Sequence, residues 1–177
     1  GALRRGDPLG AEITLGKAMA AGATRDEVAA YMGEALLDQD RTAVARGWLG
    51  PQRFSPASAA VGFRALARLE RVAGNLPGAG AAFDKAIALT PDDAGMWVEI
   101  GRLRYAGGEH LLAIEAADRS LGLDPKNVRA LEFRGQIVRD QYGTAAALPW
   151  FEAAREQAPR DLSVLGEQAA TLGDLGR

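Results

Sequence analysis

The sequence contains no cysteine, a single histidine, His110, and only three lysines. Without cysteine the chain has no disulfide, and no thiolate to act as a nucleophile or as a ligand of zinc or an iron–sulfur cluster. One histidine excludes any site that needs two. The longest apolar run, residues 145–151, is far shorter than the roughly 20 residues that cross a bilayer. We therefore expect no metal, no cofactor and no direct membrane insertion.

Charge of either sign is nearly balanced, with 21 basic and 23 acidic residues and a net charge of −2. A nucleic-acid partner is not expected, because such proteins carry a basic surface. The 177 residues suffice for about one domain. Arginine far outnumbers lysine and alanine is abundant, which we interpret as the coding bias of a GC-rich genome.

A period of 34 residues runs through the chain. Pro91, Pro125 and Pro159 follow one another at this interval. Two further columns at the same step contain only small residues: Ala11, Ala45, Ala79, Ala113 and Ala147, and then Gly33, Ala67, Gly101, Gly135 and Ala169. A column of mostly bulky residues comprises Leu15, Leu49, Phe83, Ala117 and Phe151. A period of this length indicates stacked supersecondary units.

Each period predicts two helices. Apolar residues recur at helical spacing before the break at Gly74-Asn75 and again after it. The small columns predict close crossings between helices, since Gly and Ala let two backbones approach. Thr24 with Glu27 is typical of a capping box, and Asp92 is the expected cap of the helix that follows it. The second helix of the unit at 26–59 is expected to end near Leu49, before Gly50-Pro51.

These residues resemble the tetratricopeptide repeat family. The unit that starts at residue 60 shows the family's apolar, Leu-small, Ala, aromatic, Ala and Pro positions at Phe63, Leu66, Ala67, Ala79, Phe83, Ala86 and Pro91. The resemblance implies an all-α, right-handed superhelical solenoid of antiparallel helix pairs over residues 1–177. The expected solenoid comprises a half repeat at 9–22 (second helix only), a degenerate repeat at 26–59, repeats at 60–93, 94–127 and 128–161, and a half repeat at 162–177 (first helix only).

The half repeats predict that the chain is part of a longer protein. We also expect residues 162–172 to expose an apolar face that includes Val164, Leu165, Ala169 and Leu172. A fragment that ends there would be a monomer or a dimer driven by truncation.

Catalytic motifs are missing. The segment from Gly10 to Lys17 has the wrong spacing for a phosphate loop, lacks its hydroxyl and falls in a helical pattern. His110 has neither a second histidine nor a cysteine beside it for a metal site. No Gly-x-Ser-x-Gly motif is present. We expect a protein that is not an enzyme.

The family resemblance implies that the first helix of each unit lines a concave groove for a protein segment. The predicted groove residues are Arg64, Arg68, Arg71, Arg102, Tyr105, Arg129, Gln136 and Arg139. Arginine suits an acidic or C-terminal carboxylate ligand, because guanidinium binds carboxylate bidentately. The alternative is that these arginines are merely solvated and interleaved with Glu70, Glu99 and Glu132. Glu99 replaces the asparagine of the family's carboxylate clamp, so that specificity is not transferred.

The sequence therefore predicts a non-catalytic interaction scaffold whose protein or peptide partner it does not identify. Two alternatives stay open: the repeat portion of a larger enzyme or transferase, and an assembly or secretion factor of the bacterial envelope. The compartment, cytoplasmic or periplasmic, is not fixed by the sequence.

Overall fold

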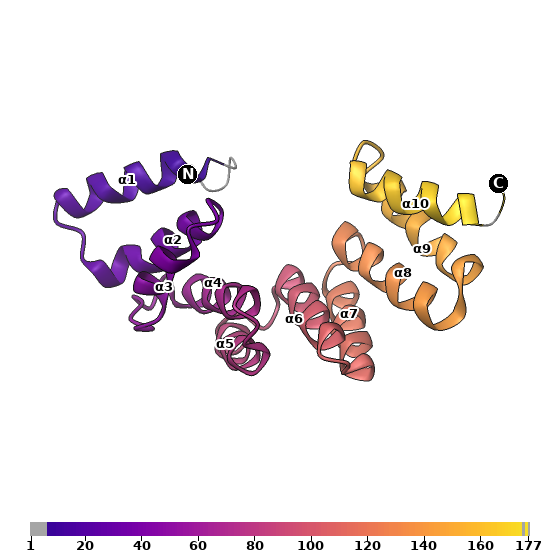
Figure 1. The fold of residues 1–177 in the computed structure, drawn as a ribbon, viewed down its shortest axis with the longest axis horizontal. Helices are drawn as coiled ribbons and strands as arrows, with labels where there is room; N and C mark the ends of the chain where they lie inside the picture. The colour runs from indigo at the N-terminus through magenta and orange to yellow at the C-terminus, as the bar shows by residue number, and fades with distance from the viewer. Residues whose placement is uncertain (1–6, 175, 177) are drawn as a thin grey trace. The chain divides into compact units, whose positions relative to one another are not determined.

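The structure is a computed structural model that describes residues 7–174 and 176. Throughout these residues the regular structure is helical, without a strand (Figure 1). The helices are α1 (Pro8–Ala20), α2 (Arg25–Leu37), α3 (Thr42–Leu49), α4 (Ala59–Val72), α5 (Leu76–Leu89), α6 (Ala94–Ala106), α7 (His110–Leu123), α8 (Val128–Tyr142), α9 (Thr144–Gln157) and α10 (Leu162–Asp174). The predicted all-α helical-repeat class is confirmed.

The chain divides into two compact units, with the boundary between Pro91 and Asp92. Unit 1 contains α1 to α5 and unit 2 contains α6 to α10. Within the units, α2 packs on α3, α4 on α5, α6 on α7 and α8 on α9. Below, the first member of each pair, together with α10, is called a first helix, and the second member a second helix.

The turns within two of these pairs depend on glycine. Gly74 between α4 and α5 has φ +77°, and Gly108 between α6 and α7 has φ +81°. Other residues rarely adopt this left-handed conformation. After the first of these turns, the Asn75 side chain accepts a hydrogen bond from the Gly78 N–H at 3.1 Å and so begins α5. The predicted break at Gly74-Asn75 is confirmed.

Of the two helix caps predicted from the sequence, one is present in the structure and the other lies at a different residue. The Thr24–Glu27 capping box is present at the start of α2. The expected cap at Asp92 is wrong: the Asp93 carboxylate accepts the hydrogen bond from the Met96 N–H, at 3.0 Å. Pro91-Asp92 forms a turn, so that α6 begins one residue later and the cap falls on the residue directly before Ala94.

Helix α3 is the shortest in the described part of the chain and ends at Leu49, as predicted. It has 8 residues, whereas α5 has 14. The chain then continues without regular structure to Phe54, whose ring lies edge-on to Phe63 of α4 at 5.3 Å between ring centroids. The segment after the short α3 therefore packs on α4 through Phe54.

The small-residue positions lie at helix contacts. A Cβ added to Gly135 on α8 would come within 2.8 Å of the Phe151 ring on α9. One added to Gly101 on α6 would come within 2.7 Å of the Phe133 ring on α8. Phe133 and Phe151 are both almost fully buried. The predicted role of Gly101 and Gly135 in close packing is confirmed.

Helix α10 buries more than the sequence suggested. Leu165 and Ala169 are exposed, as expected, but Val164 is fully buried. Val164 forms a core cluster with Leu131 and Ala154, since α10 packs on α9. The expectation that Val164 lies on an uncovered face is wrong for this reason.

Candidate functional site

In unit 1 the predicted groove arginines lie on α4. The Arg64 guanidinium donates to Glu34 at 3.1 Å, and the Arg68 guanidinium donates to Asp38 at 2.9 Å. Glu34 belongs to α2, and Asp38 is the residue that ends this helix. Two of the three arginines therefore bind carboxylates of the preceding first helix. Arg71 is exposed and makes no ion pair within residues 7–174.

In unit 2, α6 contributes Arg102 and Tyr105. The Arg102 guanidinium lies over the Phe133 ring, 5.5 Å from its centroid. The Tyr105 hydroxyl donates a hydrogen bond to the Asp140 carboxylate of α8, and its ring centroid lies 4.9 Å from that of His110. This hydrogen bond, together with burial, raises the pKa of Tyr105 above its ordinary value of 10.0. Tyr105 therefore links two first helices of this unit.

Helix α8 contributes the remaining predicted residues. Gln136 and Arg139 donate to the two oxygens of the same carboxylate, Glu167 of α10, at 2.9 and 2.7 Å. Arg129 is exposed and makes no ion pair in the described part of the chain. Below, the first-helix surface of unit 2 means the residues Arg102, Tyr105, Arg129, Glu132, Gln136, Arg139 and Glu167.

The structure thus gathers the predicted residues of each unit on its first helices, but it also adds carboxylates that the sequence analysis missed. Glu34, Asp38, Asp140 and Glu167 lie 28 to 35 residues from their partners. This separation, close to one repeat, was the signal that could have found them. Because half-exposed ion pairs of this kind stabilise a protein by only about 0–1 kcal/mol, their main effect is to neutralise the arginines.

One residue of the first-helix surface of unit 2 has an unusual environment. Glu132 on α8 is only 6% exposed, and its Oε1 atom is buried without a hydrogen-bond partner. Phe133 and Leu131, its neighbours in the sequence, belong to core clusters. Buried polar atoms in folded proteins are nearly always paired, so each exception calls for an explanation.

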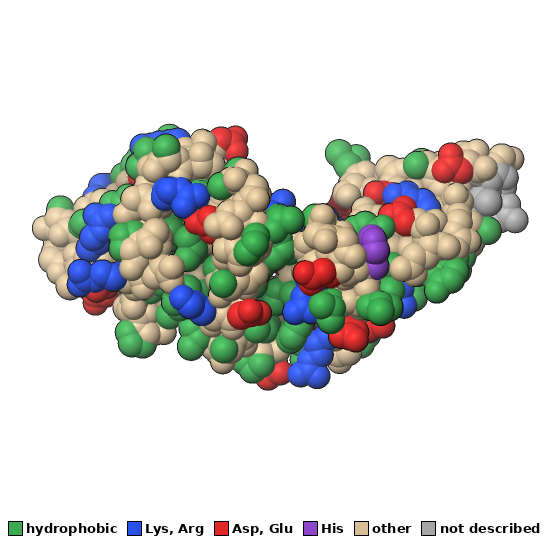
Figure 2. Space-filling view, turned by 60° about the horizontal axis from the view of Figure 1, so that its bottom comes forward, with side chains coloured by type: hydrophobic (Ala, Val, Ile, Leu, Met, Phe, Trp, Pro, Cys, Tyr) green, Lys and Arg blue, Asp and Glu red, His purple; other side chains and the backbone are tan. Residues whose placement is uncertain are grey.

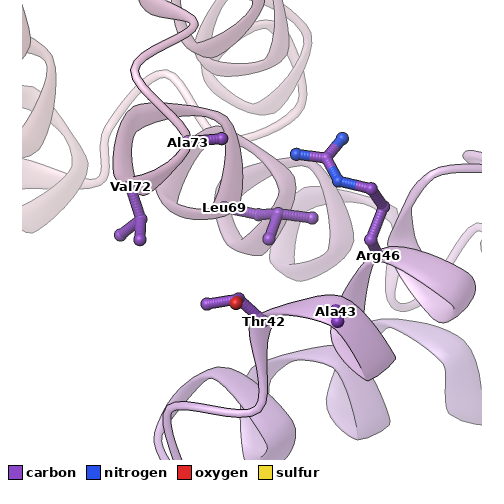
Figure 3. Close-up of a pocket in the computed structure, with 6 residues that line it drawn as sticks. All are labelled: Thr42, Ala43, Arg46, Leu69, Val72 and Ala73. Atoms are coloured by element: carbon purple, nitrogen blue, oxygen red, sulfur yellow. The ribbon is translucent and has the colours of Figure 1, made fainter.

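Unit 1 contains two open hollows beside the short helix α3. One, of about 190 Å³, is lined by Thr42, Ala43, Arg46, Leu69, Val72 and Ala73; Figure 3 shows Leu69 and Val72 of α4 pointing toward α3. The other, of about 270 Å³, shares Arg46 and extends to Lys85 of α5. Its polar groups are paired with one another: Arg46 and Asn75 donate to Glu70, and Lys85 donates to Gln52. None of the predicted site residues lines either hollow.

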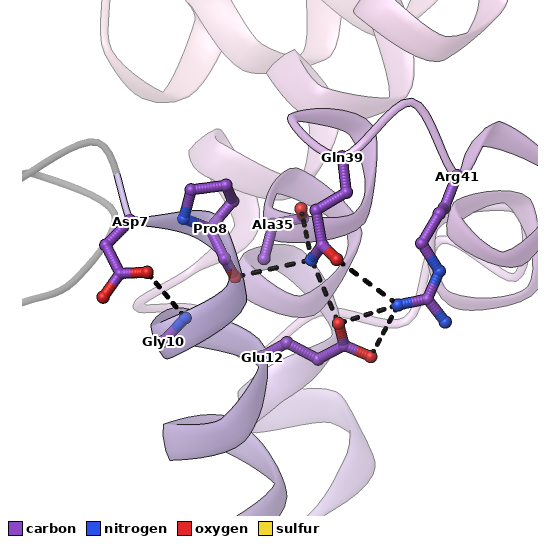
Figure 4. Close-up of polar contacts among 7 residues, drawn as sticks. All are labelled: Asp7, Pro8, Gly10, Glu12, Ala35, Gln39 and Arg41. Atoms are coloured by element: carbon purple, nitrogen blue, oxygen red, sulfur yellow. Dashed lines mark hydrogen bonds and ion pairs between the residues drawn. The ribbon is translucent and has the colours of Figure 1, made fainter.

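A further polar cluster fixes α1 to the turn that follows α2 (Figure 4). Arg41 donates to Glu12 at 2.8 Å, and Gln39 donates to the same carboxylate at 3.0 Å. These hydrogen bonds, from Gln39 first and then from Arg41, lower the pKa of Glu12. The cluster is explained by helix packing and requires no ligand.

Metal and membrane sites find no support in the described residues. Residues 7–174 and 176 contain no group of three or more His, Cys, Asp or Glu side chains that could hold a metal ion. No helix in the same part of the chain is long and apolar enough to span a bilayer. On the face shown in Figure 2, basic and acidic side chains are interspersed instead of forming a patch of one sign.

Comparisons with known proteins agree with this repeat architecture. Residues 64–128 and 98–161 match the family model described as tetratricopeptide repeat, which together is more than half of the chain. No functionally curated protein has a sequence that matches the chain.

Solved structures with a similar fold include three repeat proteins whose sequences are distant. The crystal structure of MamA is 23% identical, with a TM-score of 0.69 over 90% of this chain and 93% of that chain. PilF of Pseudomonas aeruginosa is 23% identical, with a TM-score of 0.73 over 85% of this chain and 68% of its own. TTC0263, a thermophilic protein of Thermus thermophilus, is 19% identical, with a TM-score of 0.74 over 96% of this chain and 93% of its own. At these identities the likeness establishes the fold alone.

Proposed function

The chain belongs to the tetratricopeptide repeat family, and from that premise we propose that it is a non-catalytic scaffold that binds a peptide or protein segment on its first helices. Proteins of this family are typically interaction scaffolds. The observation that carries the proposal is a set of cations on these helices, Arg71, Arg102 and Arg129, that make no ion pair within residues 7–174. Guanidinium groups left without a carboxylate are available to a ligand.

The same observation narrows the chemistry of the ligand. Arg64, Arg68 and Arg139 already bind carboxylates of neighbouring helices and contribute little positive charge to a partner. Acidic groups of a segment bound to unit 1 would instead meet Arg71, since guanidinium binds carboxylate bidentately. Those of a segment bound to unit 2 would meet Arg102 or Arg129. The sequence contains neither the phosphate-loop motif nor a Gly-x-Ser-x-Gly motif, which favours binding without chemistry.

A charge reversal tests this proposal. The double variant Arg71→Glu and Arg102→Glu removes two available cations without breaking any ion pair. The matched control is Arg119→Glu with Arg155→Glu, which reverses two exposed arginines on second helices of unit 2. Binding is measured by titrating each variant with a partner that wild type has captured from bacterial extract.

The proposal expects the partner to bind the control variant as tightly as it binds wild type. Its affinity for the Arg71→Glu, Arg102→Glu variant should be at least about tenfold lower, because hydrogen bonds to charged groups are lost. Equal binding by all three proteins would place the partner on another surface and overturn the proposal. Circular dichroism of each variant verifies that the helices are retained.

A further inference from the structure

Glu132 differs from the other carboxylates on the first-helix surface of unit 2. Glu167 accepts hydrogen bonds from two side chains, and Asp140 accepts one from Tyr105. Glu132 is more buried than either, at 6% exposure, yet its Oε1 atom has no donor among the described residues. A buried carboxylate oxygen without a donor loses its hydration and gains no hydrogen bond in exchange, which destabilises the fold.

The basic residues of the same surface do not supply the missing donor. Arg139 donates to Glu167, and Arg102 lies over the Phe133 ring. Arg129, one helical turn before Glu132, is exposed and makes no ion pair in this part of the chain. Within the described residues, folding alone therefore leaves Glu132 Oε1 without a donor.

The adjoining face of α10 leaves room for a ligand. Gly166 follows Glu132 by 34 residues, one full repeat, and so occupies the equivalent position on the next first helix. A Cβ added to Gly166 or to Gly173 would meet no atom within 4 Å, and Ala170 between them is exposed. The hydrogen bonds from Gln136 and Arg139 to Glu167, the residue after Gly166, hold this part of α10 beside α8. A polypeptide backbone can lie close to α10 here, because no long side chain projects from these three positions.

We propose that unit 2 binds an extended protein segment along α8 and α10 and that a lysine of this segment forms an ion pair with Glu132. An ammonium group is the donor that best compensates a buried carboxylate, since charge-assisted hydrogen bonds are about twice as strong as neutral ones. Lysine is favoured over arginine because its compact ammonium on a flexible stem reaches an enclosed oxygen more easily than a planar guanidinium does. The inference rests on the proposed function and adds a positively charged residue to a ligand whose acidic groups meet Arg102 or Arg129.

The experiment uses the whole chain and a positional library of short synthetic peptides in which one position at a time is fixed as each amino acid. Wild type, Glu132→Gln and Glu115→Gln are compared. Glutamine at 132 keeps the shape of the side chain and removes its charge, while Glu115, exposed on α7, provides the same loss of charge outside the surface. The best lysine peptide is then titrated against its acetyl-lysine counterpart by fluorescence anisotropy.

The proposal expects wild type and Glu115→Gln to select lysine at one position and to bind the lysine peptide about tenfold or more tightly than its acetylated form. Glu132→Gln should lose this discrimination while it still binds the acetylated peptide. Equal discrimination by Glu132→Gln would overturn the inference. A preference of wild type for arginine at this position would also overturn the inference. A preference for neutral residues would do the same, because it would mean that the carboxyl group binds peptide amides instead.

The outcome separates this inference from the function on which it rests. If reversal of Arg71 and Arg102 weakens partner binding but lysine is not selected, the first-helix surface binds its partner without Glu132, and the inference alone fails. If neither change affects binding, the proposed function fails as well.

Discussion

Phe133 of α8 lies against Gly101 of α6, so closely that a Cβ on Gly101 would come within 2.7 Å of its ring. In two other helix pairs the second-helix residue that faces the glycine has a bulky side chain: Leu49 contacts Gly33, and Phe151 contacts Gly135. In the α6–α7 pair the residue at the corresponding position is the small Ala117, which shares a core cluster with Phe133. The Phe133 ring, which comes from the next first helix, therefore occupies the volume that a bulky second-helix residue occupies in the α2–α3 and α8–α9 pairs.

This packing predicts that both glycines resist even the smallest substitution. Gly101→Ala and Gly135→Ala should each destabilise unit 2 by about 1–3 kcal/mol, because the rings of Phe133 and Phe151 are buried and must move. Gly80→Ala on α5 is the control, since a Cβ there would meet nothing within 4 Å. It should stabilise by about 0.5–1 kcal/mol through its helix preference. Urea unfolding monitored by circular dichroism measures the change in the free energy of unfolding for each variant. An increase for Gly135→Ala would contradict the packing argument.

The start of α2 gives a second prediction. Thr24 and Glu27 satisfy two backbone N–H groups reciprocally, and the Thr24 N–H donates to the Glu27 carboxylate at 2.7 Å. Thr24→Ala should therefore lower the free energy of unfolding of unit 1 by about 1 kcal/mol. Thr24→Ser keeps the hydroxyl group and should restore most of this loss in the same urea titration. If serine and alanine proved equivalent, the hydroxyl would contribute nothing to stability.

The sequence predicted the features that repeat and missed those that depend on one side chain. The positions of Gly101 and Gly135 followed from a period that every unit must obey for its helices to stack. The pairing of Arg68 with Asp38 did not, because it joins two helices 30 residues apart through long side chains whose rotamers no periodicity fixes. The sequence identified Glu132 only as an acid interleaved with the predicted groove arginines, since a single glutamate in a helical pattern does not reveal how deeply its carboxyl group is buried.

The polar cluster around Glu70 predicts an acid dependence of unit 1. The hydrogen bond from Arg46, and next the one from Asn75, lowers the pKa of Glu70 below its ordinary value of 4.5. Because the folded-state pKa is depressed, the contribution of Glu70 to stability is present above pH 4.5 and is lost as the pH falls through the folded-state pKa.

Glu70→Gln should therefore cost stability near neutral pH but progressively less below pH 4.5. Urea titrations of wild type and variant over this range measure the difference. Asp84→Asn, an exposed carboxylate on α5 without an ion pair in the described residues, should show no such convergence. A difference for Glu70→Gln that stays constant with pH would show that the charge of Glu70 is unimportant.

Replacement of Glu132 by an apolar residue should raise the stability of unit 2 and weaken ligand binding. In Glu132→Met an apolar side chain of similar length replaces a buried carboxylate whose Oε1 has no donor, so the free energy of unfolding should rise by about 1–3 kcal/mol. Glu115→Met, at an exposed site, should change it by less than about 0.5 kcal/mol. Both values come from urea unfolding, and the same two proteins are then tested for lysine-peptide discrimination. A site kept for a ligand is expected to show this opposition, since stability and function compete where a charge is held ready for a partner. Loss of stability in Glu132→Met would instead show that the carboxyl group holds the fold together, for example through a bridging water, and has no surplus charge to offer.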